Sequence, residues 1–181
     1  MKKLHVIIIV LLSIFCIGCK KKDCPAFPDN LNYFPYYQGK ELKFSNSKND
    51  ICSFLIAETF NSKAEKFEWN CKCSCEASSA FHTNQNQDSL KIDCSLTILG
   101  NDASSVELRC WFGYSYIYSD SFGKVLSSGQ KIPYKELTKH LSDTISIENK
   151  NNKLVRKIVI IKNKGLVSYS TADGEEWKLV E

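Results

Sequence analysis

The sequence lacks the motifs that identify several large enzyme classes. It contains no G-x-S-x-G nucleophile elbow, no H-E-x-x-H zinc motif, no phosphate-binding P-loop and no G-x-G-x-x-G dinucleotide motif. Histidine is scarce: after His5, the chain has only His82 and His140, and neither has a nucleophile beside it in sequence. We therefore expect no catalytic residue, no metal and no cofactor, and we expect the protein not to be an enzyme.

A strong charge of either sign is also missing. Lysine and arginine number 24 and the acidic residues 20, a formal net charge of +4. Proteins that bind nucleic acid usually show a basic patch or stripe. So small an imbalance excludes nucleic acid as an expected partner.

No apolar run is long enough for a transmembrane helix, which needs about 20 residues. The N-terminal run, residues 6–17, has twelve residues broken only by Ser13, and it follows Lys2 and Lys3. A short positive start and an apolar region of about 7–15 residues are typical of a secretory signal peptide. We therefore expect residues 1–18 to be a signal peptide, with an uncleaved membrane anchor as the alternative.

The sequence Ile17-Gly18-Cys19 closes this run and resembles the lipobox, the processing site of bacterial lipoproteins. The resemblance implies a diacylglyceryl thioether on Cys19 and an acylated amino terminus, and stable anchoring needs more than one acyl chain. Cys16 stands where the family usually has leucine. Lysines 20–22 would then lie against anionic headgroups, where each charge adds about 1 kcal/mol. Cleavage at another position is the alternative.

Cleavage before Cys19 would leave one domain of ordinary size. Residues 19–39 contain three of the four prolines, which favour extended backbone, and we interpret them as a lipidated tether and leading segment. From residue 40 onward apolar and polar residues alternate with period two, as in half-buried strands. We therefore expect residues 40–181 to form a single antiparallel β domain.

The alternation predicts about nine strands joined by short turns. Asn163-Lys164-Gly165 and Asp173-Gly174 are turn signals. Pro133, followed by apolar residues at helical spacing, predicts one short helix over 133–141. The fold class is therefore mainly β, an antiparallel barrel, half-barrel or sandwich. The predicted strands lie near residues 42–44, 51–60, 66–77, 92–98, 106–118, 144–147, 154–161, 166–170 and 177–180.

Nine cysteines are a heavy usage for a chain of this length. Once Cys16 is removed with the signal peptide and Cys19 carries the lipid, seven cysteines remain. Because this number is odd, at least one thiol is free or pairs with another molecule. In an oxidising compartment the others should mostly form disulfides. Cys71, Cys73 and Cys75 alternate along one predicted strand, where neighbours about 6.6–6.8 Å apart are too far to pair easily. We expect them to pair across strands, with a zinc or copper(I) site or redox chemistry as alternatives.

One disulfide can be assigned from the expected register. If residues 101–103 form a loop, residues 100 and 104 face each other, and the same register places Cys94 opposite Cys110. Directly opposed residues in an antiparallel pair lie about 4.5–5.5 Å apart, within the range of a disulfide. We therefore predict a Cys94–Cys110 bridge, with Cys75 as the rival partner of Cys94. Cys24 is expected to reach Cys71 or Cys73.

Two aromatic groups allow two interpretations. Each is either a stacking surface for a sugar, lipid or protein, or part of the core, and core is the preferred interpretation for both. The possible binding surface is a set that should share one strand face: Phe112, Tyr114, Tyr116 and Tyr118. The second group lies in the leading segment: Tyr33, Phe34, Tyr36 and Tyr37.

Several short motifs together resemble small uncharacterised lipoproteins of Gram-negative bacteria. The motifs are DCPAFP at 23–28, YFPY at 33–36, CKCSC at 71–75, KGLV at 164–167 and WKL at 177–179. The resemblance implies a cell-envelope location and a β fold, and it adds no catalytic residue.

These features favour an envelope lipoprotein, held on the outer rather than the inner membrane by lipid on Cys19 and facing the periplasm or the cell exterior. We expect a non-enzymatic binding or scaffold module for a protein or small ligand. The alternative is an inhibitor or immunity lipoprotein that blocks an envelope enzyme such as a lysozyme with the polar loop 83–88. A ligand carrier would show an interior cavity. An enzyme would need His82 or His140 beside an acid or thiol.

Overall fold

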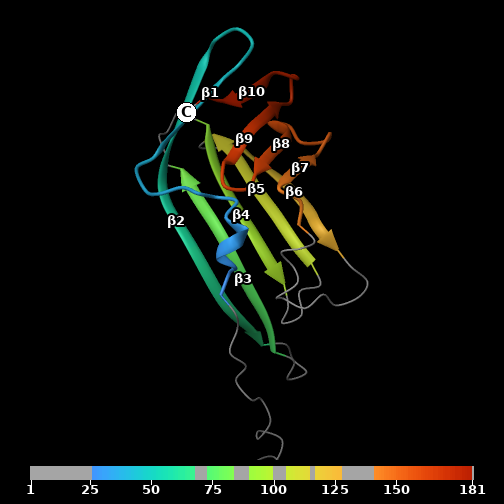
Figure 1. The fold of residues 1–181 in the computed structure, drawn as a ribbon. Helices are drawn as coiled ribbons and strands as arrows, with labels where there is room; N and C mark the ends of the chain where they lie inside the picture. The colour runs from blue at the N-terminus through green and yellow to red at the C-terminus, as the bar shows by residue number, and fades with distance from the viewer. Residues whose placement is uncertain are drawn as a thin grey trace, which may run out of the picture.

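The computed structural model describes residues 26–180 except for the segments 68–72, 84–89, 100–104, 115–116 and 128–140; the side chains of 63–67, 73–75, 114 and 117–127 are not described either. As the sequence predicts, the fold is mainly β. In the described part of the chain, ten antiparallel strands form one curled, half-barrel sheet (Figure 1). The helical structure among the described residues is a single 3-10 turn, η1 (Asp29–Leu31), and no helix there is long and apolar enough to cross a membrane.

The order of strands across the sheet is β6-β5-β4-β3-β2-β1-β10-β9-β8-β7. The final strand β10 therefore lies next to the first strand β1, and β6 and β7 are the two edges. The strands are β1 (Glu41–Ser45), β2 (Ile51–Phe67), β3 (Cys73–Thr83), β4 (Lys91–Leu99), β5 (Ser105–Tyr114), β6 (Ile117–Ser127), β7 (Thr144–Glu148), β8 (Val155–Ile161), β9 (Gly165–Thr171) and β10 (Glu176–Leu179).

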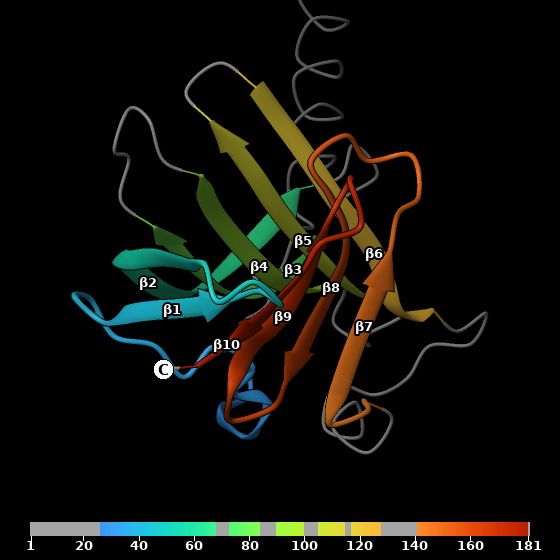
Figure 2. The same cartoon turned by 90° about the horizontal axis from the view of Figure 1, so that it is seen from above.

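Strand β2 turns the corner between the two halves of the sheet. Its start, residues 51–55, pairs with β1, and the remainder pairs with β3. The register shifts between Ile56 and Glu58, which marks a β-bulge, and bulges bend a strand and increase its twist. In Figure 2, β3 to β6 occupy the upper part of the view and β10 to β7 the lower part, with β1 and β2 joining them at the left.

The concave side of the curl is filled by one apolar cluster drawn from both halves. The Phe44 ring packs edge-on against Tyr169, with 5.2 Å between centroids, and Phe112 lies 5.8 Å from the same tyrosine. Fully buried residues of β3, β4 and β5 complete the cluster, including Phe81, Leu96, Ile98 and Leu108. The described part of the interior is thus an apolar core that joins the two halves of the sheet.

The leading segment belongs to this core, so the folded unit begins before residue 40. Phe27, Leu31 and Phe34 are buried in the same cluster. The Tyr33 hydroxyl donates a hydrogen bond to the Ser142 carbonyl oxygen at 2.6 Å. The second aromatic group is therefore mostly core, with the exception of Tyr37, which is 67% exposed.

The prediction of one strand over 66–77 is wrong. The chain turns within this stretch, because β2 ends at Phe67, β3 begins at Cys73, and these two residues pair with each other. Because Phe67 and Cys73 are both odd-numbered, this register pairs odd-numbered residues with odd-numbered ones and even-numbered residues with even-numbered ones. The apolar alternation therefore continues through the hairpin, and periodicity alone does not reveal the turn.

The prediction of one strand over 106–118 is also wrong. Strand β5 ends at Tyr114, β6 begins at Ile117, and these residues pair across a two-residue connection. This division raises the strand count from the expected nine to ten. Residues 115 and 116 include neither the glycine nor the asparagine that usually marks a two-residue hairpin, so no turn signal was present there. The predicted helix lies outside the described residues, apart from Leu141, which is not helical.

Candidate functional site

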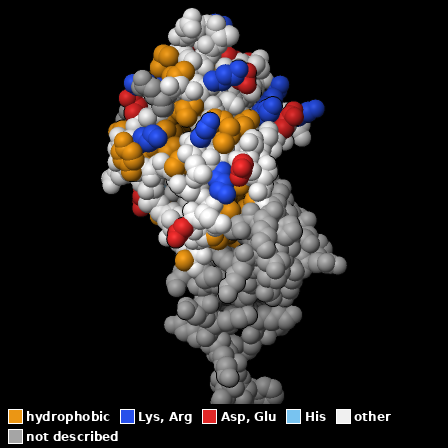
Figure 3. Space-filling model, in the orientation of Figure 1, with side chains coloured by type: hydrophobic (Ala, Val, Ile, Leu, Met, Phe, Trp, Pro, Cys, Tyr) orange, Lys and Arg blue, Asp and Glu red, His pale blue; other side chains and the backbone are white. Residues whose placement is uncertain are grey.

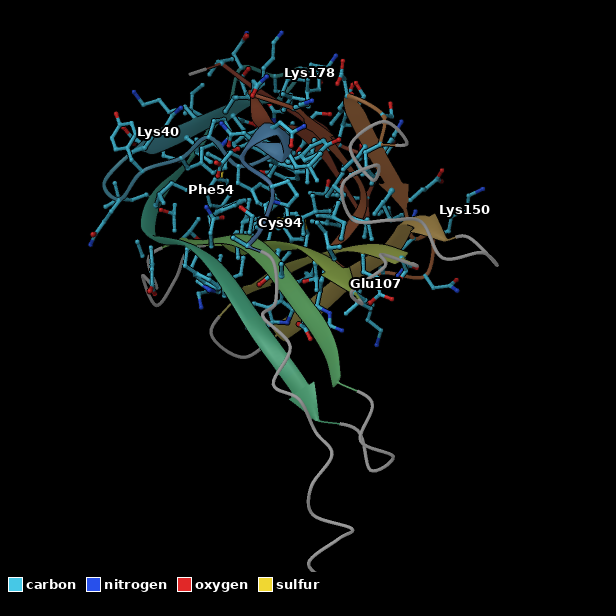
Figure 4. The ribbon with its side chains drawn as sticks, turned by 60° about the horizontal axis from the view of Figure 1, so that its bottom comes forward. Lys40, Phe54, Cys94, Glu107, Lys150 and Lys178 are labelled. Atoms are coloured by element: carbon cyan, nitrogen blue, oxygen red, sulfur yellow. A yellow bond between two sulfur atoms is a disulfide. The ribbon has the colours of Figure 1, made fainter. Side chains whose placement is uncertain are left out.

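A hollow of about 580 Å³ lies on the outer face of β2 to β5, on the side of the sheet opposite the core. Figure 4 shows that this part of the sheet, marked by Cys94 on β4 and Glu107 on β5, has side chains on both faces. We call this feature the outer hollow. Its described lining residues are Phe60, Glu76, Ser78, Ala80, His82, Asp93, Cys94, Ser95, Thr97, Arg109 and Trp111.

Strand register explains how residues far apart in sequence line this hollow. Because successive side chains of a strand point to opposite faces, the neighbours of core residues such as Phe81 and Cys110 point outward. Paired residues on adjacent strands then form rows across the outer face. The rows are Glu58-His82-Asp93-Trp111, Phe60-Ala80-Ser95-Arg109 and Ser62-Ser78-Thr97-Glu107.

The middle of the outer hollow is a floor of small side chains. Ser78 and Ala80 supply it from β3, and Ser95 and Thr97 from β4. Phe60 and Trp111 lie on the strands to either side, β2 and β5. These strands are three inter-strand spacings apart, about 14 Å. The two aromatic residues therefore flank a shallow slot that runs along β3 and β4.

One end of the slot holds a charged network around Asp93. His82 Nδ1 lies 3.3 Å from Asp93 Oδ1, and Lys91 Nζ lies 3.2 Å from Oδ2. The backbone N–H of Thr83 donates a hydrogen bond to the same Oδ1 atom. Three groups thus hold this carboxylate in place on the sheet.

Both flanking rings are held by neighbours. Phe60 stacks on the His82 ring, with 5.3 Å between centroids and 23° between planes. The Lys91 ammonium lies 5.3 Å from the centroid of the Trp111 ring, within the range of a cation–π contact. Because Lys91 also pairs with Asp93, the network connects the tryptophan to the histidine and, through it, to the phenylalanine.

The His82–Asp93 pair meets the proximity that an enzyme would require. Among the described residues, no hydrogen bond joins His82 to a hydroxyl or thiol. Of the carboxylates that line the hollow, Glu76 lies six residues along β3 from His82, a distance of about 20 Å, so Asp93 and Glu76 are farther apart than the roughly 5–9.5 Å between carboxylates that flank a glycosidic bond. Outside the lining, Glu58 on β2 pairs directly with His82.

The Cys94–Cys110 disulfide is confirmed. The two residues pair directly across β4 and β5, with 4.1 Å between their Cα atoms, and both are buried on the core side. The bridge ties together the strands that carry Asp93 and Trp111. Cys75 is not the partner, because its register position on β3 is opposite Glu65, whereas Cys94 lies opposite Phe81.

The other cysteines for which the sequence predicts a role lie wholly or partly outside the described residues. Cys19, Cys24 and Cys71 lie outside the described residues, and of Cys73 and Cys75 only the backbone in β3 is described. Within the described part of the chain, Cys52 is a free thiol, half-buried opposite Phe44. Burial raises the pKa of this thiol, partly offset by its hydrogen bond with Tyr169, so it stays protonated and weakly nucleophilic near neutral pH.

The predicted aromatic surface is wrong as a shared strand face. Phe112 is fully buried in the core, and Tyr118 belongs to β6, where it pairs with Gly113. The side chains of Tyr114, Tyr116 and Tyr118 lie outside the described residues. The aromatic residue of β5 that lines the outer hollow is Trp111. Sequence reasoning missed it, although its place between core-facing Cys110 and Phe112 was a signal that it points outward.

Two other sequence-predicted features lie mostly or wholly outside the described residues. Of the polar loop 83–88, only Thr83 is described, at the end of β3, and His140 falls in an undescribed segment. Within the described ranges, no three histidine, cysteine or acidic residues gather as metal ligands would.

A second surface has exposed apolar side chains but is broken up by charges. Ile51, Leu55 and Val180 are exposed on β2 and next to β10. Ion pairs lie on the neighbouring strands, Lys43 with Glu41 and Lys178 with Glu176. Figure 3 shows apolar and charged side chains interspersed over the described part of one face. This interspersed pattern is ordinary for a protein surface.

Comparisons of the chain with protein-family models, with curated proteins and with solved structures give no match.

Proposed function

We propose that the protein is a membrane-anchored envelope lipoprotein that acts as a non-enzymatic binding module, with the outer hollow as its ligand site. The observation that supports the ligand site is the pair of flanking aromatic residues, Phe60 and Trp111, across a floor of small and mostly polar side chains. A volume of about 580 Å³ lies within the range of about 300–1,000 Å³ that is usual for small-ligand sites.

The rigidity of this part of the sheet supports binding. The lining residues stand on strands rather than on loops, and sites built on regular elements are held more accurately. The Cys94–Cys110 bridge lies directly beneath, and the Asp93 network fixes His82 and Lys91. A ligand would therefore meet groups that are already in position, which lowers the entropy cost of binding.

The membrane anchor is the second part of the proposal. It is supported by the short apolar run, the positive start and the Ile17-Gly18-Cys19 sequence. Lipid on Cys19 would hold the domain at the envelope, where the chain from residue 20 to Phe27 would separate the anchor from the folded core.

Filling the outer hollow tests the ligand site. Ser95→Trp places a large ring on the floor between β3 and β5. We expect full-length wild-type protein, purified in detergent, to retain a ligand from envelope extract and Ser95→Trp to lose it. The matched control is Leu55→Trp, which adds the same ring at an exposed position of β2 outside the hollow. Equal retention by all three proteins, with unchanged thermal unfolding, would exclude the hollow as the site.

A further inference from the structure

We infer that the outer hollow binds a neutral oligosaccharide chain that lies along β3 and β4, between Phe60 and Trp111. This inference rests on the proposed function of the hollow as a ligand site and adds the chemical class of the ligand.

The charges of the hollow favour a ligand without net charge. Its described lining includes two carboxylates, Glu76 and Asp93, and one guanidinium, Arg109. Lys91 adds a second positive charge beside Asp93 and Trp111, and the adjoining rows of the outer face add the carboxylates Glu58 and Glu107. An acidic ligand would meet these carboxylates, and a basic ligand would meet Arg109 and Lys91. Because each kind of charged ligand meets like charges as well as opposite ones, neither gains an unopposed attraction.

The hydrogen-bonding groups favour a ligand rich in hydroxyls. Carboxylates only accept hydrogen bonds, guanidinium and ammonium groups only donate them, and the hydroxyls of Ser78, Ser95 and Thr97 do both. A sugar hydroxyl also does both, so it can bond to either kind of group wherever a donor or an acceptor site is left beside the partners within the protein. These polar groups are half-buried or exposed, so a purely apolar ligand would displace water from them without replacing its hydrogen bonds, which opposes binding.

The flanking rings suit the apolar faces of sugar rings. Phe60 is 39% exposed although it stacks on His82, and Trp111 is half-buried on the other side of the floor. Flat aromatic rings offer a large contact area with few torsions to immobilise. Sugar rings present C–H groups on their faces and hydroxyls at their edges. Such rings can pack against the flanking aromatics while their hydroxyls reach the polar floor.

An extended peptide fits this surface less well than a glycan. Peptides that bind to sheets usually add a strand at an open edge. Strands β3 and β4 are interior, each paired on both sides, so their backbone groups are already bonded within the sheet. The open edges of the sheet are β6 and β7, outside the described lining of the hollow. A peptide would therefore have only side-chain contacts here.

Titration calorimetry on the full-length chain tests the inference. A detergent without sugar is required, because glycoside detergents would compete for the site. The probes are the neutral tetramers chitotetraose and cellotetraose, an acidic galacturonate tetramer, tetralysine and a Gly-Ser tetrapeptide. We expect at least one neutral tetramer to bind, and we expect Trp111→Ala and Phe60→Ala each to weaken that binding about tenfold or more.

Leu55→Ala is the matched control, because it truncates an exposed apolar residue of β2 outside the hollow and should leave the affinity unchanged. Thermal unfolding of each variant separates loss of binding from loss of fold, and Phe60→Ala, at a partly exposed position, keeps the test available if Trp111→Ala fails to fold.

The pattern of binding decides between the two proposals. If only the charged or peptide probes bind, and the same variants lose that binding, the ligand is not a neutral glycan but the hollow remains a ligand site. Glycan binding that survives both variants would place the sugar elsewhere and overturn the inference. Absence of binding by every probe would overturn the inference that the ligand is a neutral glycan. The proposed function would fail only if Ser95→Trp also left ligand retention from extract unchanged.

Discussion

Tyr36 and Gly165 are in direct contact although 129 positions separate them in the chain. A Cβ atom added to Gly165 would overlap the Tyr36 hydroxyl and ring, and the glycine has a φ of +90°. The next residue, Leu166, donates its backbone N–H to that hydroxyl at 2.6 Å. The start of β9 thus fits onto the leading segment only if position 165 lacks a side chain.

Gly165→Ala should therefore destabilise the fold strongly. A left-handed backbone costs a residue with a Cβ about 1–2 kcal/mol. The overlap would also push Tyr36 away and leave the buried Leu166 N–H unsatisfied, which costs about 1–3 kcal/mol more. We expect a total loss of about 3 kcal/mol, measured by urea unfolding.

Gly174→Ala is the control for this prediction. Gly174 has nearly the same φ, +92°, but nothing lies within 4 Å of the position its Cβ would take. Gly174→Ala should lose only the free energy that a left-handed backbone costs a residue with a Cβ atom, about 1–2 kcal/mol. Equal losses for the two variants would show that the contact with Tyr36 contributes nothing.

Alkaline pH should weaken the fold through Tyr33. Burial, helped by the negative charge of Asp143, raises the pKa of this phenol to about 12. Folding therefore favours the protonated phenol. Its contribution is complete below the unfolded pKa of about 10 and is lost as the pH rises through 12, a change of roughly 2–3 kcal/mol.

Tyr33→Phe checks this prediction. The variant should lose the hydrogen bond to Ser142, about 1 kcal/mol at neutral pH, and show a shallower decline in unfolding free energy between pH 10 and 12. Tyr36, whose pKa burial also raises, is present in both proteins, so its effect cancels in the difference. Parallel curves for wild type and Tyr33→Phe would contradict the assignment.

Removal of the Cys94–Cys110 bridge should also destabilise the protein. The bonded residues are 16 positions apart, and closing a loop of that size contributes roughly 3 kcal/mol on chain-entropy grounds. We expect the double variant Cys94→Ala, Cys110→Ala to lose about 2–4 kcal/mol in urea unfolding. Mass spectrometry of a non-reduced digest gives an independent check, and a peptide that links Cys94 to any other cysteine would disprove the pairing.

Cys19 should be the lipid acceptor. We expect Cys19→Ala to abolish incorporation of a labelled fatty acid and to leave unprocessed precursor, because the lipidated thiol is what the processing peptidase recognises in lipoproteins. Cys16→Ala is the matched control and should keep the label. Undiminished label on Cys19→Ala would refute the anchor.

The sequence predicted those parts of the fold that depend on short-range patterns. The alternation of apolar and polar residues predicted which residues of β4 and β5 face the core. The short connection expected between these strands predicted the register that places Cys94 opposite Cys110. The turn before Gly165 and the turn at Gly174 were also predicted, because positive φ angles favour glycine.

The features that the sequence did not reveal depend on longer-range pairing. Phe67 pairs with Cys73, so the alternation of apolar and polar residues runs on unchanged from one strand to the next. The alternation alone therefore does not reveal the change of direction between these two residues. Phe60 and Trp111 flank the same floor only because β2 to β5 are adjacent and in a particular register, which includes a bulge after Ile56. Neither alternation nor turn residues specify a bulge in the middle of a strand, so the outer hollow could not be derived from the sequence.

The place of β10 in the sheet affects the order in which the protein can be completed. Strands β7 to β10 follow one another as hairpins and can pair as they emerge, whereas the edge of β1 that faces away from β2 has no partner strand until β10 arrives. That final seam is short, with register pairs at Phe44–Leu179 and Ser45–Lys178. A chain that is threaded through a membrane from its N-terminus would therefore expose this edge of β1 until β10 had crossed, and only then would the sheet become continuous.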